Sequence, residues 1–408
     1  MQKPDTFIAA GWDFFGASDG PSDIWAVDPN TRYPVLWWQV PPAELPALPS
    51  FSGGDGTPEE PYLVSSVKQL NSIGYNPRLM ASHFMLTNDM DLTGTGFFLI
   101  GSELFPFTGV FDGGGRTLSN LMHSSADRGY VGFFRYVAGR NARIEHVGLI
   151  APSVHGGGGN HVGALVGYLE DGTLSDCHVD GGIVTGEDRI GGLVGCSRYG
   201  TVINCHSRVT VSGDRTTGGL VGDSHGVTIE DCYASGEVKS QDDEAGGLVG
   251  YSLSGVITRC HATSAVRGND GVGGLVGIAS SDIANCYCTG AVVGYRDVGG
   301  LVGGNLGVIT HCYSTGRVTG YPGQHDVGGL VGADGFGRIQ ASFWDVDASR
   351  QGTSAGGTAK GTAELQTAST YLAAGWDFVD ETENGAEDIW WILEGQDYPH
   401  LSWEAEER

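Results

Sequence analysis

The sequence predicts an all-β chain, a right-handed parallel β-helix (solenoid) of about 26–29 residues per coil, with small helical and strand caps at both ends. The first observation is a short phrase, Gly-(Gly/Ala)-Leu-Val-Gly, that occurs seven times. Successive copies start 28, 27, 28, 27, 26 and 29 residues apart. A nearly constant period in this range indicates one supersecondary unit stacked on copies of itself. The copies start at Gly163, Gly191, Gly218, Gly246, Gly273, Gly299 and Gly328.

The second observation is a cysteine that recurs with the same spacing as the phrase. Segments of four to seven residues between these markers are rich in β-branched side chains and are separated by Gly, Asn and Asp. That pattern is typical of short strands and tight turns. Parallel coils stack at about 4.8 Å, so each inward position becomes a column of like residues. We expect one such column of Cys177, Cys205, Cys232, Cys260, Cys286 and Cys312, and another of Ile183, Val211, Val238, Val266, Val292 and Val318.

The eight cysteines also raise the alternatives of disulfides or a zinc site. Adjacent strand residues face opposite sides, so a pair such as Cys177 and His178 cannot ligate one metal together. Stacked side chains point in parallel rather than toward each other, which disfavours a disulfide. A buried cysteine packs as a small hydrophobe. We therefore expect a column of free thiols, with no metal and no cofactor, and keep disulfide and metal as alternatives.

The repeat resembles a known family. Gly-Gly-Leu-Val-Gly, a Gly-(Val/Thr)-Ile turn, Asn/Asp-Cys-Tyr/His and then Gly-x-Val is similar to the GLUG repeat. That repeat occurs in large secreted and surface-attached bacterial proteins, including the non-catalytic region of IgA-cleaving metallopeptidases. The resemblance covers about residues 100–345 and implies a surface or adhesive role. The metallopeptidase motif His-Glu-x-x-His is absent from this sequence, so the resemblance implies no catalytic centre of that type.

The flanking segments predict caps. Terminal repeats of a solenoid must be atypical, because an open coil exposes strand edges and apolar columns. Short helices are expected over Ser66–Ile73 and Thr362–Leu372. The predicted organisation is residues 1–40 as the tail motif of a preceding array, 41–50 as a Pro-rich linker, 51–99 as the N-terminal cap, 100–345 as the GLUG β-helix and 346–408 as the C-terminal cap and tail motif.

The two ends of the chain also resemble each other. Eight of the nine tryptophans lie outside residues 100–345, and the phrase Ala-Gly-Trp-Asp-Phe around Trp12 returns around Trp376. Asp-Ile-Trp at Trp25 likewise returns at Trp390. Residues 2–39 therefore look like the tail of a preceding array, which makes the chain a piece of a longer tandem protein. The alternative is that one tail motif is duplicated to cap both ends.

The residue after each cysteine should face outward, because neighbouring strand residues alternate between the two faces. These residues are aromatic or histidine, and they are flanked by hydrogen-bonding groups such as Asp176, Asn204 and Asp231. Flat rings beside polar groups suit stacking on sugar faces. The alternative is that the rings only stabilise the sheet by stacking across coils. The predicted ligand-binding residues are His206, Tyr233, His261, Tyr287, Tyr313 and Phe343.

A second, acidic ribbon precedes the Gly-Gly positions. Carboxylates repeated at coil spacing can hold calcium or act as the paired acids of a glycosidase. Asp next to Gly is also what a tight corner selects. The regular repetition favours turn chemistry, because catalysis needs a unique and locally irregular constellation. The ribbon comprises Asp188, Asp214, Asp243, Glu244, Asp270, Asp297 and Asp326.

Charge and hydropathy exclude several partners. The formal net charge is −26 and the sequence pI is about 4.6. An acidic surface repels phosphate backbones and anionic lipids, so no nucleic acid partner is expected. No apolar run of 18 residues is present, so no membrane insertion is expected. Through the GLUG resemblance, we expect an extracellular or cell-surface location.

The sequence therefore predicts a non-catalytic structural or adhesive module of a large secreted or cell-surface bacterial protein. Its expected partners are an extracellular polysaccharide or another surface protein, together with adjacent tandem modules of the same parent chain. The alternative is a polysaccharide-degrading β-helix enzyme, either a glycoside hydrolase or a polysaccharide lyase. An enzyme would need an excursion from one coil that walls a groove, and the even spacing shows none.

Overall fold

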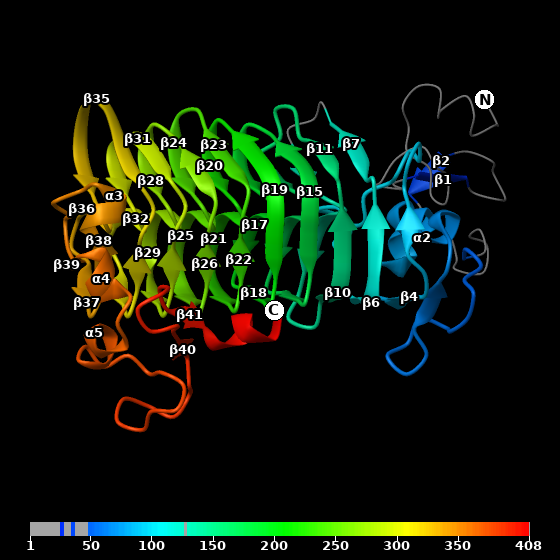
Figure 1. Cartoon of the computed structure of the whole chain (residues 1–408). Coiled ribbons are helices and arrows are strands. Elements are labelled where there is room, and N and C mark those ends of the chain that lie inside the picture. Colours follow the sequence, from blue (N-terminus) through cyan, green and yellow to red (C-terminus); the bar gives the residue numbers. More distant parts are fainter. Residues whose placement is uncertain (1–24, 28–33, 37–47, 126–128, 408) are drawn as a thin grey trace.

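The computed structural model describes residues 25–27, 34–36, 48–125 and 129–407. Within these ranges the chain forms a parallel β-solenoid of about nine turns, seen from the side in Figure 1. Each strand pairs in parallel with its counterpart one coil further on, as His178 does with His206 and Tyr233 with His261. The predicted all-β solenoid is confirmed.

Three runs of short strands make up the walls of the coils. The strands leading into the Gly-Gly positions are β8 (Tyr130–Val131), β12 (His161–Gly163), β16 (Asp188–Gly191), β20 (Arg215–Gly218), β24 (Asp243–Gly246), β28 (Asp270–Gly273), β31 (Val292–Gly299) and β35 (Val318–Gly328). The next wall holds β9 (Phe134–Ala138), β13 (Val166–Glu170), β17 (Val194–Arg198), β21 (Val221–Glu230), β25 (Val249–Thr258), β29 (Val276–Ala284), β32 (Val302–Asn305) and β36 (Val331–Asp334). This wall is continued by shorter strands, namely β14 (Thr173–Ser175), β18 (Thr201–Ile203), β33 (Val308–Thr310) and β37 (Arg338–Gln340). The wall after the cysteines holds β10 (Arg143–Ile150), β15 (His178–Thr185), β19 (His206–Gly213), β22 (Tyr233–Ala234), β26 (His261–Ala262), β30 (Tyr287–Cys288), β34 (Tyr313–Ser314) and β38 (Phe343–Asp345), followed by β7 (Met122–Ser124), β11 (Ser153–His155), β23 (Glu237–Ser240) and β27 (Ala265–Arg267).

The predicted cysteine column forms the interior as expected. All six sulfurs are buried, with at most 1% of any of these residues exposed. The aliphatic column is confirmed except at its first member. Val184, not Ile183, pairs with Val211, because the register shifts between Asp180 and Ile183. That shift lets the apolar side chain of Val184 stay inside.

One residue before each cysteine bends the chain by adopting a left-handed backbone. Asp176, Asn204 and Asp231 have φ values of 54°, 51° and 50°. Asn and Asp tolerate this region better than other non-glycine residues, which accounts for their frequency at this position. The same conformation recurs at Arg259, Asn285, His311 and Ala341.

The repeated Gly-Gly-Leu-Val-Gly phrase reflects close approach between coils. A Cβ atom on Gly247 would lie 1.9 Å from the carbonyl oxygen of Gly274 in the next coil. The leucine and valine that follow, Leu248 and Val249, are fully buried. The phrase therefore places two coils at backbone contact and then fills the interior with branched side chains.

The N-terminal cap contains β3 (Tyr62–Val64), α2 (Val67–Gly74), η3 (Pro77–Leu79), β4 (His83–Leu86) and β5 (Met90–Asp91), and leads into the long strand β6 (Val110–Ser119). The predicted helix is confirmed, and its N-cap Ser66 accepts a hydrogen bond from the Gln69 amide. A cluster of buried rings closes this end of the core, including Phe84, Phe107 and Phe111.

The C-terminal cap contains α3 (Val346–Ser349), β39 (Thr358–Lys360), α4 (Thr362–Leu365) and α5 (Ala368–Leu372). One helix was predicted over 362–372, and the structure instead has two short helices separated at Gln366 and Thr367. The residues that follow, 371–407, are called the tail here. The tail holds the antiparallel pair β40 (Trp390–Trp391) and β41 (His400–Leu401) and the turn η4 (Ser402–Glu407).

The tail turns back and runs along the outside of the solenoid, as the red segment in Figure 1 shows. At the other end of the chain, β1 (Trp25–Val27) pairs antiparallel with β2 (Pro34–Leu36). If the two ends are copies of one motif, Trp12 should be buried as Trp376 is, but Trp12 lies outside the described residues. The predicted domain boundaries remain predictions.

Candidate functional site

The outward aromatic residues form one continuous stack, named here the aromatic ladder. Its first five steps have ring centroids 4.6–5.0 Å apart and planes within 11° of parallel. Each ring face therefore lies against the ring above or below it. The ladder consists of His178, His206, Tyr233, His261, Tyr287, Tyr313 and Phe343.

The tail covers the C-terminal part of this ladder. Tyr313 is fully buried, Tyr287 is 3% exposed and Phe343 is 5% exposed. Trp376 and Trp390, which pack over them, are both fully buried. These residues form a second hydrophobic core outside the solenoid.

Three tryptophans of the tail also attach to bends of the solenoid coils through their indole N–H groups. Trp376 donates to the carbonyl oxygen of Ala341 at 2.8 Å. Trp390 donates to Oδ1 of Asn285 at 3.4 Å. Trp403 donates to the carbonyl oxygen of Arg259 at 3.1 Å. All three acceptors belong to the left-handed residues before the cysteine positions. As the tail runs toward its C-terminus, it meets these bends in descending order of residue number.

A polar group lies in the middle of this covered surface. The Tyr287 hydroxyl donates to both carboxylate oxygens of Glu404, at 3.0 and 2.9 Å. His400 Nδ1 lies 3.5 Å from Glu404, and the adjacent carboxylate raises the pKa of His400. Burial acts to raise the pKa of Glu404, but the adjacent His400 and the nearby His261 outweigh burial and lower it.

The prediction that the ladder offers open ring faces to a ligand is therefore wrong over most of its length. The rings do point away from the solenoid core, as expected. However, the neighbouring rungs occupy their faces, and the tail covers the edges of His261, Tyr287, Tyr313 and Phe343. The tail was predicted as a cap, and sequence reasoning did not place it on the ladder.

The ladder stays accessible only beyond the end of the tail. A hollow of about 400 Å³ lies there, beside Trp403. Two of the predicted ligand-binding residues line it, His206 and Tyr233, and Tyr233 is itself 7% exposed. The hollow is lined by Asp176, Asn204, Cys205, His206, Asp231, Tyr233 and Trp403.

The chemistry of this hollow is polar with aromatic walls. Asn204 donates to Asp176 at 3.4 Å, and Arg259 donates to Asp231 at 2.8 Å. Burial lowers the pKa of His206 to about 4, so this imidazole is neutral near pH 7. The site thus offers amide, carboxylate and neutral ring groups for hydrogen bonding. Sequence reasoning proposed His206 and Tyr233 as ligand-binding residues and named Asp176, Asn204 and Asp231 as polar groups beside the rings. It did not find Trp403, whose place depends on the fold of the tail.

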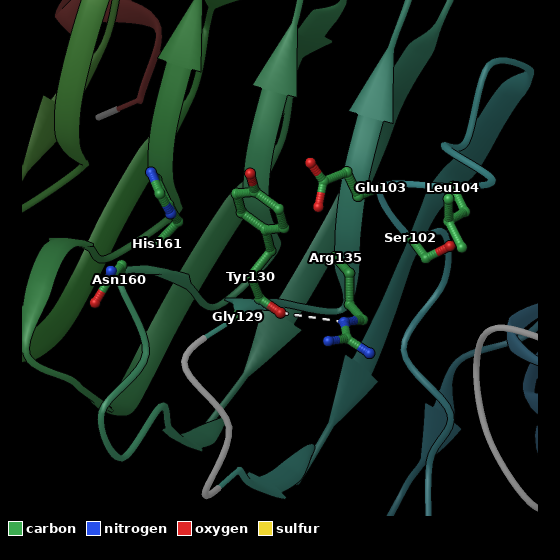
Figure 2. Close-up of a pocket in the computed structure, with 8 residues that line it drawn as sticks. All are labelled: Ser102, Glu103, Leu104, Gly129, Tyr130, Arg135, Asn160 and His161. Carbon is green, nitrogen blue, oxygen red and sulfur yellow. Dashed lines mark hydrogen bonds between the residues drawn. The ribbon is translucent and has the colours of Figure 1, made fainter. Parts of the chain in front are cut away.

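A second hollow, of about 440 Å³, lies near the N-terminal end of the solenoid and is drawn in Figure 2. Its residues come from strands β8, β9 and β12, from Gly129 and Asn160 just before β8 and β12, and from the segment 102–104. Tyr130 packs against His161 and Tyr168 at 4.9 and 5.1 Å between ring centroids. Burial lowers the pKa of His161 to about 4. Sequence reasoning did not identify this cluster, because its rings fall in irregular coils outside the ladder spacing.

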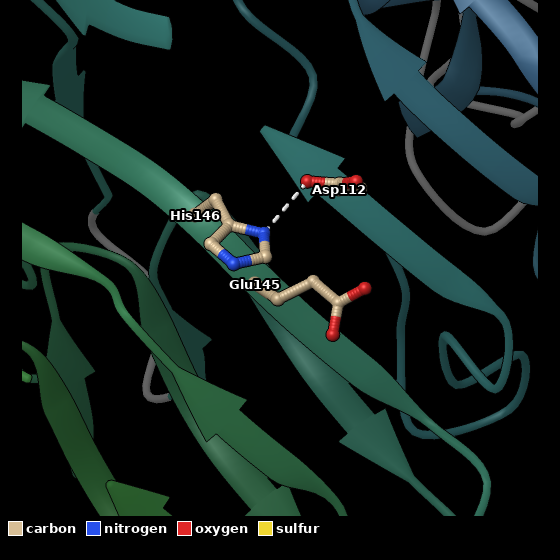
Figure 3. Close-up of side chains that lie close together, drawn as sticks. All are labelled: Asp112, Glu145 and His146. Carbon is tan, nitrogen blue, oxygen red and sulfur yellow. Dashed lines mark hydrogen bonds and ion pairs between the residues drawn. The ribbon is translucent and has the colours of Figure 1, made fainter. Parts of the chain in front are cut away.

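One group of side chains could offer ligands to a metal ion, and Figure 3 shows it. Asp112, Glu145 and His146 place one ligand atom each within 4.8 Å of one another. His146 Nδ1 already lies 3.0 Å from Asp112 Oδ1, and this hydrogen bond raises the pKa of His146. The imidazole is about half exposed, with a relative side-chain exposure of 49%. The arrangement is that of a surface ion pair.

The acidic ribbon does not form one column. Asp243 pairs in register with Asp270, and Asp270 pairs with Arg296. Asp297 and Asp326 stand one position further on, with φ values of 50° and 56°. Arg296 forms an ion pair with Asp270 at 2.9 Å. Split columns and ion pairing fit the turn interpretation of these carboxylates.

All eight cysteines are free and buried, as the thiol interpretation predicted. Burial raises the pKa of the column thiols well above the usual value at Cys177, Cys205, Cys232, Cys260 and Cys286. Their sulfurs donate to strand carbonyls, as Cys232 does to Glu230 at 3.0 Å. These groups are packing residues without nucleophilic character.

The chain is similar to known proteins in sequence and in fold. Residues 158–185, 186–212 and 294–319 match the family model described as the GLUG motif. The chain carries GLUG repeats. The fold is also found in a crystal structure of a candidate immunoglobulin A1 protease from Bacteroides ovatus, with a TM-score of 0.51 and 20% identity over 86% of this chain and 95% of that one. At this identity, the likeness shows the fold.

Two curated proteins are similar in sequence to parts of this chain. Halomucin of Haloquadratum walsbyi is 33% identical over 143 residues, which is 33% of this chain and 2% of that protein. A protein of Evansella cellulosilytica named as a Gly-rich membrane protein is 40% identical over 82 residues, which is 19% of this chain and 8% of that protein. The GLUG chain therefore spans a small part of the length of either relative. Within the described ranges of the chain, no helix is both long and apolar enough to cross a bilayer.

Proposed function

We propose that this GLUG-repeat chain is a non-catalytic structural and adhesive module of a large secreted or cell-surface bacterial protein, and that it binds glycan at the hollow beside Trp403. Its partners are extracellular polysaccharide and neighbouring modules of the same kind. A relative named as a membrane protein supports the surface location. The rigid stack of coils supports a scaffolding role, because it presents a fixed outer surface along its whole length.

The observation that carries glycan binding is the composition of the hollow. Trp403 supplies ring surface, Tyr233 and His206 supply the edges of their stacked rings, and Asn204 and Asp176 supply exposed hydrogen-bonding groups beside them. Aromatic rings pack well against apolar faces. A sugar ring combines one such face with a rim of hydroxyl groups. Neutral or cationic glycans fit best, because the chain carries a net charge of −26.

The same groups support binding without turnover. A glycosidase needs two carboxyl groups with different protonation states, one of which donates a proton. In the hollow, Asp231 accepts hydrogen bonds from the Arg259 guanidinium at 2.8 and 3.0 Å. Asp176 is exposed and accepts from Asn204. Neither carboxylate has the apolar surroundings that keep an acid protonated at neutral pH.

A retention and release assay on a panel of polysaccharides tests this proposal. The intact chain should be retained on at least one glycan and should release no oligosaccharide. Asn204→Gly keeps the left-handed bend, because glycine adopts positive φ freely, and removes the amide. This variant should lose at least about threefold in retention with an unchanged unfolding temperature.

Asp171→Gly is the matched control, because Asp171 has the same left-handed backbone, with φ of 57°, on a different corner. It should bind like the parent chain. Released oligosaccharide would favour the alternative, a polysaccharide-degrading enzyme. Absence of retention on every glycan would overturn the binding half of the proposal and leave the structural role.

A further inference from the structure

The tail that covers the aromatic ladder has a second copy in the sequence of this chain. Residues 9–14, Ala-Ala-Gly-Trp-Asp-Phe, are identical to residues 373–378. Further identities follow at an offset of 365 positions. The matched pairs are Gly20 and Gly385, Asp23 and Asp388, Ile24 and Ile389, Trp25 and Trp390, Tyr33 and Tyr398, Pro34 and Pro399, Leu36 and Leu401, and Trp38 and Trp403.

The repeated residues are those through which the tail holds the ladder. Trp376, Trp390 and Trp403 make the three indole hydrogen bonds to the coil bends. The Pro399 carbonyl accepts a hydrogen bond from the ladder residue Tyr313 at 2.5 Å. The N-terminal segment thus retains each tryptophan that contacts the solenoid, as well as the proline.

The segment also retains residues that shape the tail itself. Trp390 pairs with Leu401 across the β40–β41 hairpin, and Trp25 pairs with Leu36 across the β1–β2 hairpin. The two hairpins therefore have the same register at matched positions. Trp390 and Leu401 are fully buried, whereas Trp25 and Leu36 are half-buried.

A second coupled pair gives independent support. A Cβ atom on Gly385 would lie 2.1 Å from the carboxylate of Asp377, so a side chain there would displace that carboxylate. That carboxylate accepts a hydrogen bond from the Glu387 amide at 2.9 Å, which fixes the turn. The N-terminal segment keeps both partners, as Asp13 and Gly20. A repeat maintained only as a generic apolar sequence would not need this glycine.

We propose that residues 9–39 are a second ladder-covering tail, and that they dock on the aromatic ladder of another GLUG solenoid. The ladder of this chain is already occupied, because its own tail covers it from His261 to Phe343. The partner is thus a second copy of the fold whose ladder is uncovered. Docking of this kind joins successive solenoids through one rigid interface.

The two copies differ where the tail meets the polar part of the ladder. His400 corresponds to Val35 and Glu404 to Gln39. A glutamine side-chain oxygen can still accept from a tyrosine hydroxyl at the Tyr287 position. The titrating His400–Glu404 pair is lost. Binding of the N-terminal copy to a ladder should therefore lack the pH dependence that this pair contributes.

A graft within the intact chain tests the proposal. Residues 375–404 are replaced by residues 11–39, so that the N-terminal copy is placed over a known ladder. A scrambled tail of the same composition is the control for loss of the interface, and a graft carrying Trp25→Ala is the control for specificity. Unfolding temperature and the near-ultraviolet signal of the stacked rings are the measurements.

The graft should keep the unfolding temperature within about 5 °C of the parent and should keep the ring signal. The scrambled tail should lower the unfolding temperature by more than that, and the Trp25→Ala graft should fall toward the scrambled control. A graft that behaves like the scrambled tail would overturn the proposal. Equal stability of the graft and of the Trp25→Ala graft would also overturn the proposal, because binding to the ladder would then not depend on the matched tryptophan.

A measurement in trans extends the same test to two molecules. The scrambled-tail chain has an uncovered ladder and an intact N-terminal copy, so it should self-associate in a concentration-dependent way in sedimentation analysis. Combining the scrambled tail with Trp25→Ala should restore the monomer. If the scrambled-tail chain stays monomeric while its coils remain folded by circular dichroism, the N-terminal copy does not dock on a ladder and the proposal fails.

Discussion

The indole nitrogen of Trp403 donates a hydrogen bond to the carbonyl oxygen of Arg259 at 3.1 Å, across 144 positions of sequence. The Trp403 ring also packs against His261, with 5.4 Å between ring centroids and 20° between their planes. A residue near the C-terminus thus forms part of the wall of a coil in the middle of the solenoid. The contact decides which part of the aromatic ladder stays accessible.

Replacing Trp390 by Ala should loosen the tail. The side chain is fully buried against Tyr287, Tyr313 and Trp376, and its removal leaves a cavity between the tail and the ladder. Truncation of a buried tryptophan costs about 3–5 kcal/mol. We expect a lower unfolding temperature and faster hydrogen exchange at the tail and at the ladder strands.

Phe336→Ala is the matched control for this experiment. Phe336 is 97% exposed, so its truncation should change the free energy of unfolding by less than about 0.5 kcal/mol. Equal effects of the two substitutions would contradict the assignment of Trp390 to a buried core outside the coils.

Gly247→Ala should destabilise the solenoid strongly. The added Cβ atom would meet the Gly274 carbonyl oxygen at 1.9 Å, and this atom belongs to the backbone of the next coil. The coils would have to separate, at a cost of about 1–3 kcal/mol or more. Gly352→Ala is the comparison, since nothing lies within 4 Å of a Cβ atom there. Urea unfolding of both variants gives the answer, and a stable Gly247→Ala chain would disprove the close coil contact.

The tail should weaken as the pH falls from about 6.5 toward 4, in part because of His261. Burial lowers the pKa of His261 from its ordinary 6.5 to about 4, while Glu404 acts to raise it and His400 acts to lower it. A lowered folded-state pKa means that this contribution to stability is complete above pH 6.5 and is lost as the pH falls toward 4. The full shift corresponds to on the order of 3 kcal/mol.

His261→Gln removes this titration and should flatten the acid limb of a plot of unfolding temperature against pH. His400 acts in the opposite sense. The adjacent Glu404 carboxylate raises the pKa of His400, so the contribution of His400 is present below the unfolded-state pKa and is lost as the pH rises through the folded-state value. His400→Gln should therefore change the alkaline side of the same plot. Parallel curves for the parent and the His261→Gln chain would contradict the burial of this ring.

The thiols should be unreactive in the folded protein. All eight are buried and free, and burial raises the pKa of Cys288 to about 12. Thiolate is the reactive species, so a thiol reagent at pH 8 should label no cysteine within minutes. The same reagent in denaturant should label all eight. Rapid labelling of the native chain would place at least one sulfur outside the interior.

Much of the fold could be read from periodicity. The spacing of the cysteines and of the Gly-Gly-Leu-Val-Gly phrase fixed one interior column and the coil length, because every coil repeats the same chemistry at the same position. The exception at Ile183 arose from Gly181 and Gly182, which adopt φ values of 69° and 85° and shift the register. An irregularity of this kind is not visible in a count of residues from the cysteine.

The candidate site was predicted in part. Alternation along the strand correctly pointed the residue after each cysteine away from the core, and so identified the members of the aromatic ladder. It could not show that the rings stack face to face, or that Trp376, Trp390 and Trp403 lie over them. The long-range contacts of the tail depend on where the chain goes after the last coil, and no local pattern in residues 371–407 specifies that direction.

The sequence by itself thus determined the repeat, the coil, the free-thiol interior and the identity of the outward rings, since each of these follows from local alternation and a constant period. Only the tertiary structure decided which rings remain open. Burial of Tyr287 and Tyr313 results from docking of the tail over residues more than 80 positions away, as the hydrogen bonds from Tyr287 to Glu404 and from Tyr313 to Pro399 show. Burial of apolar ring surface away from water is favourable whichever segment buries it, and in this fold the tail of the same chain does so.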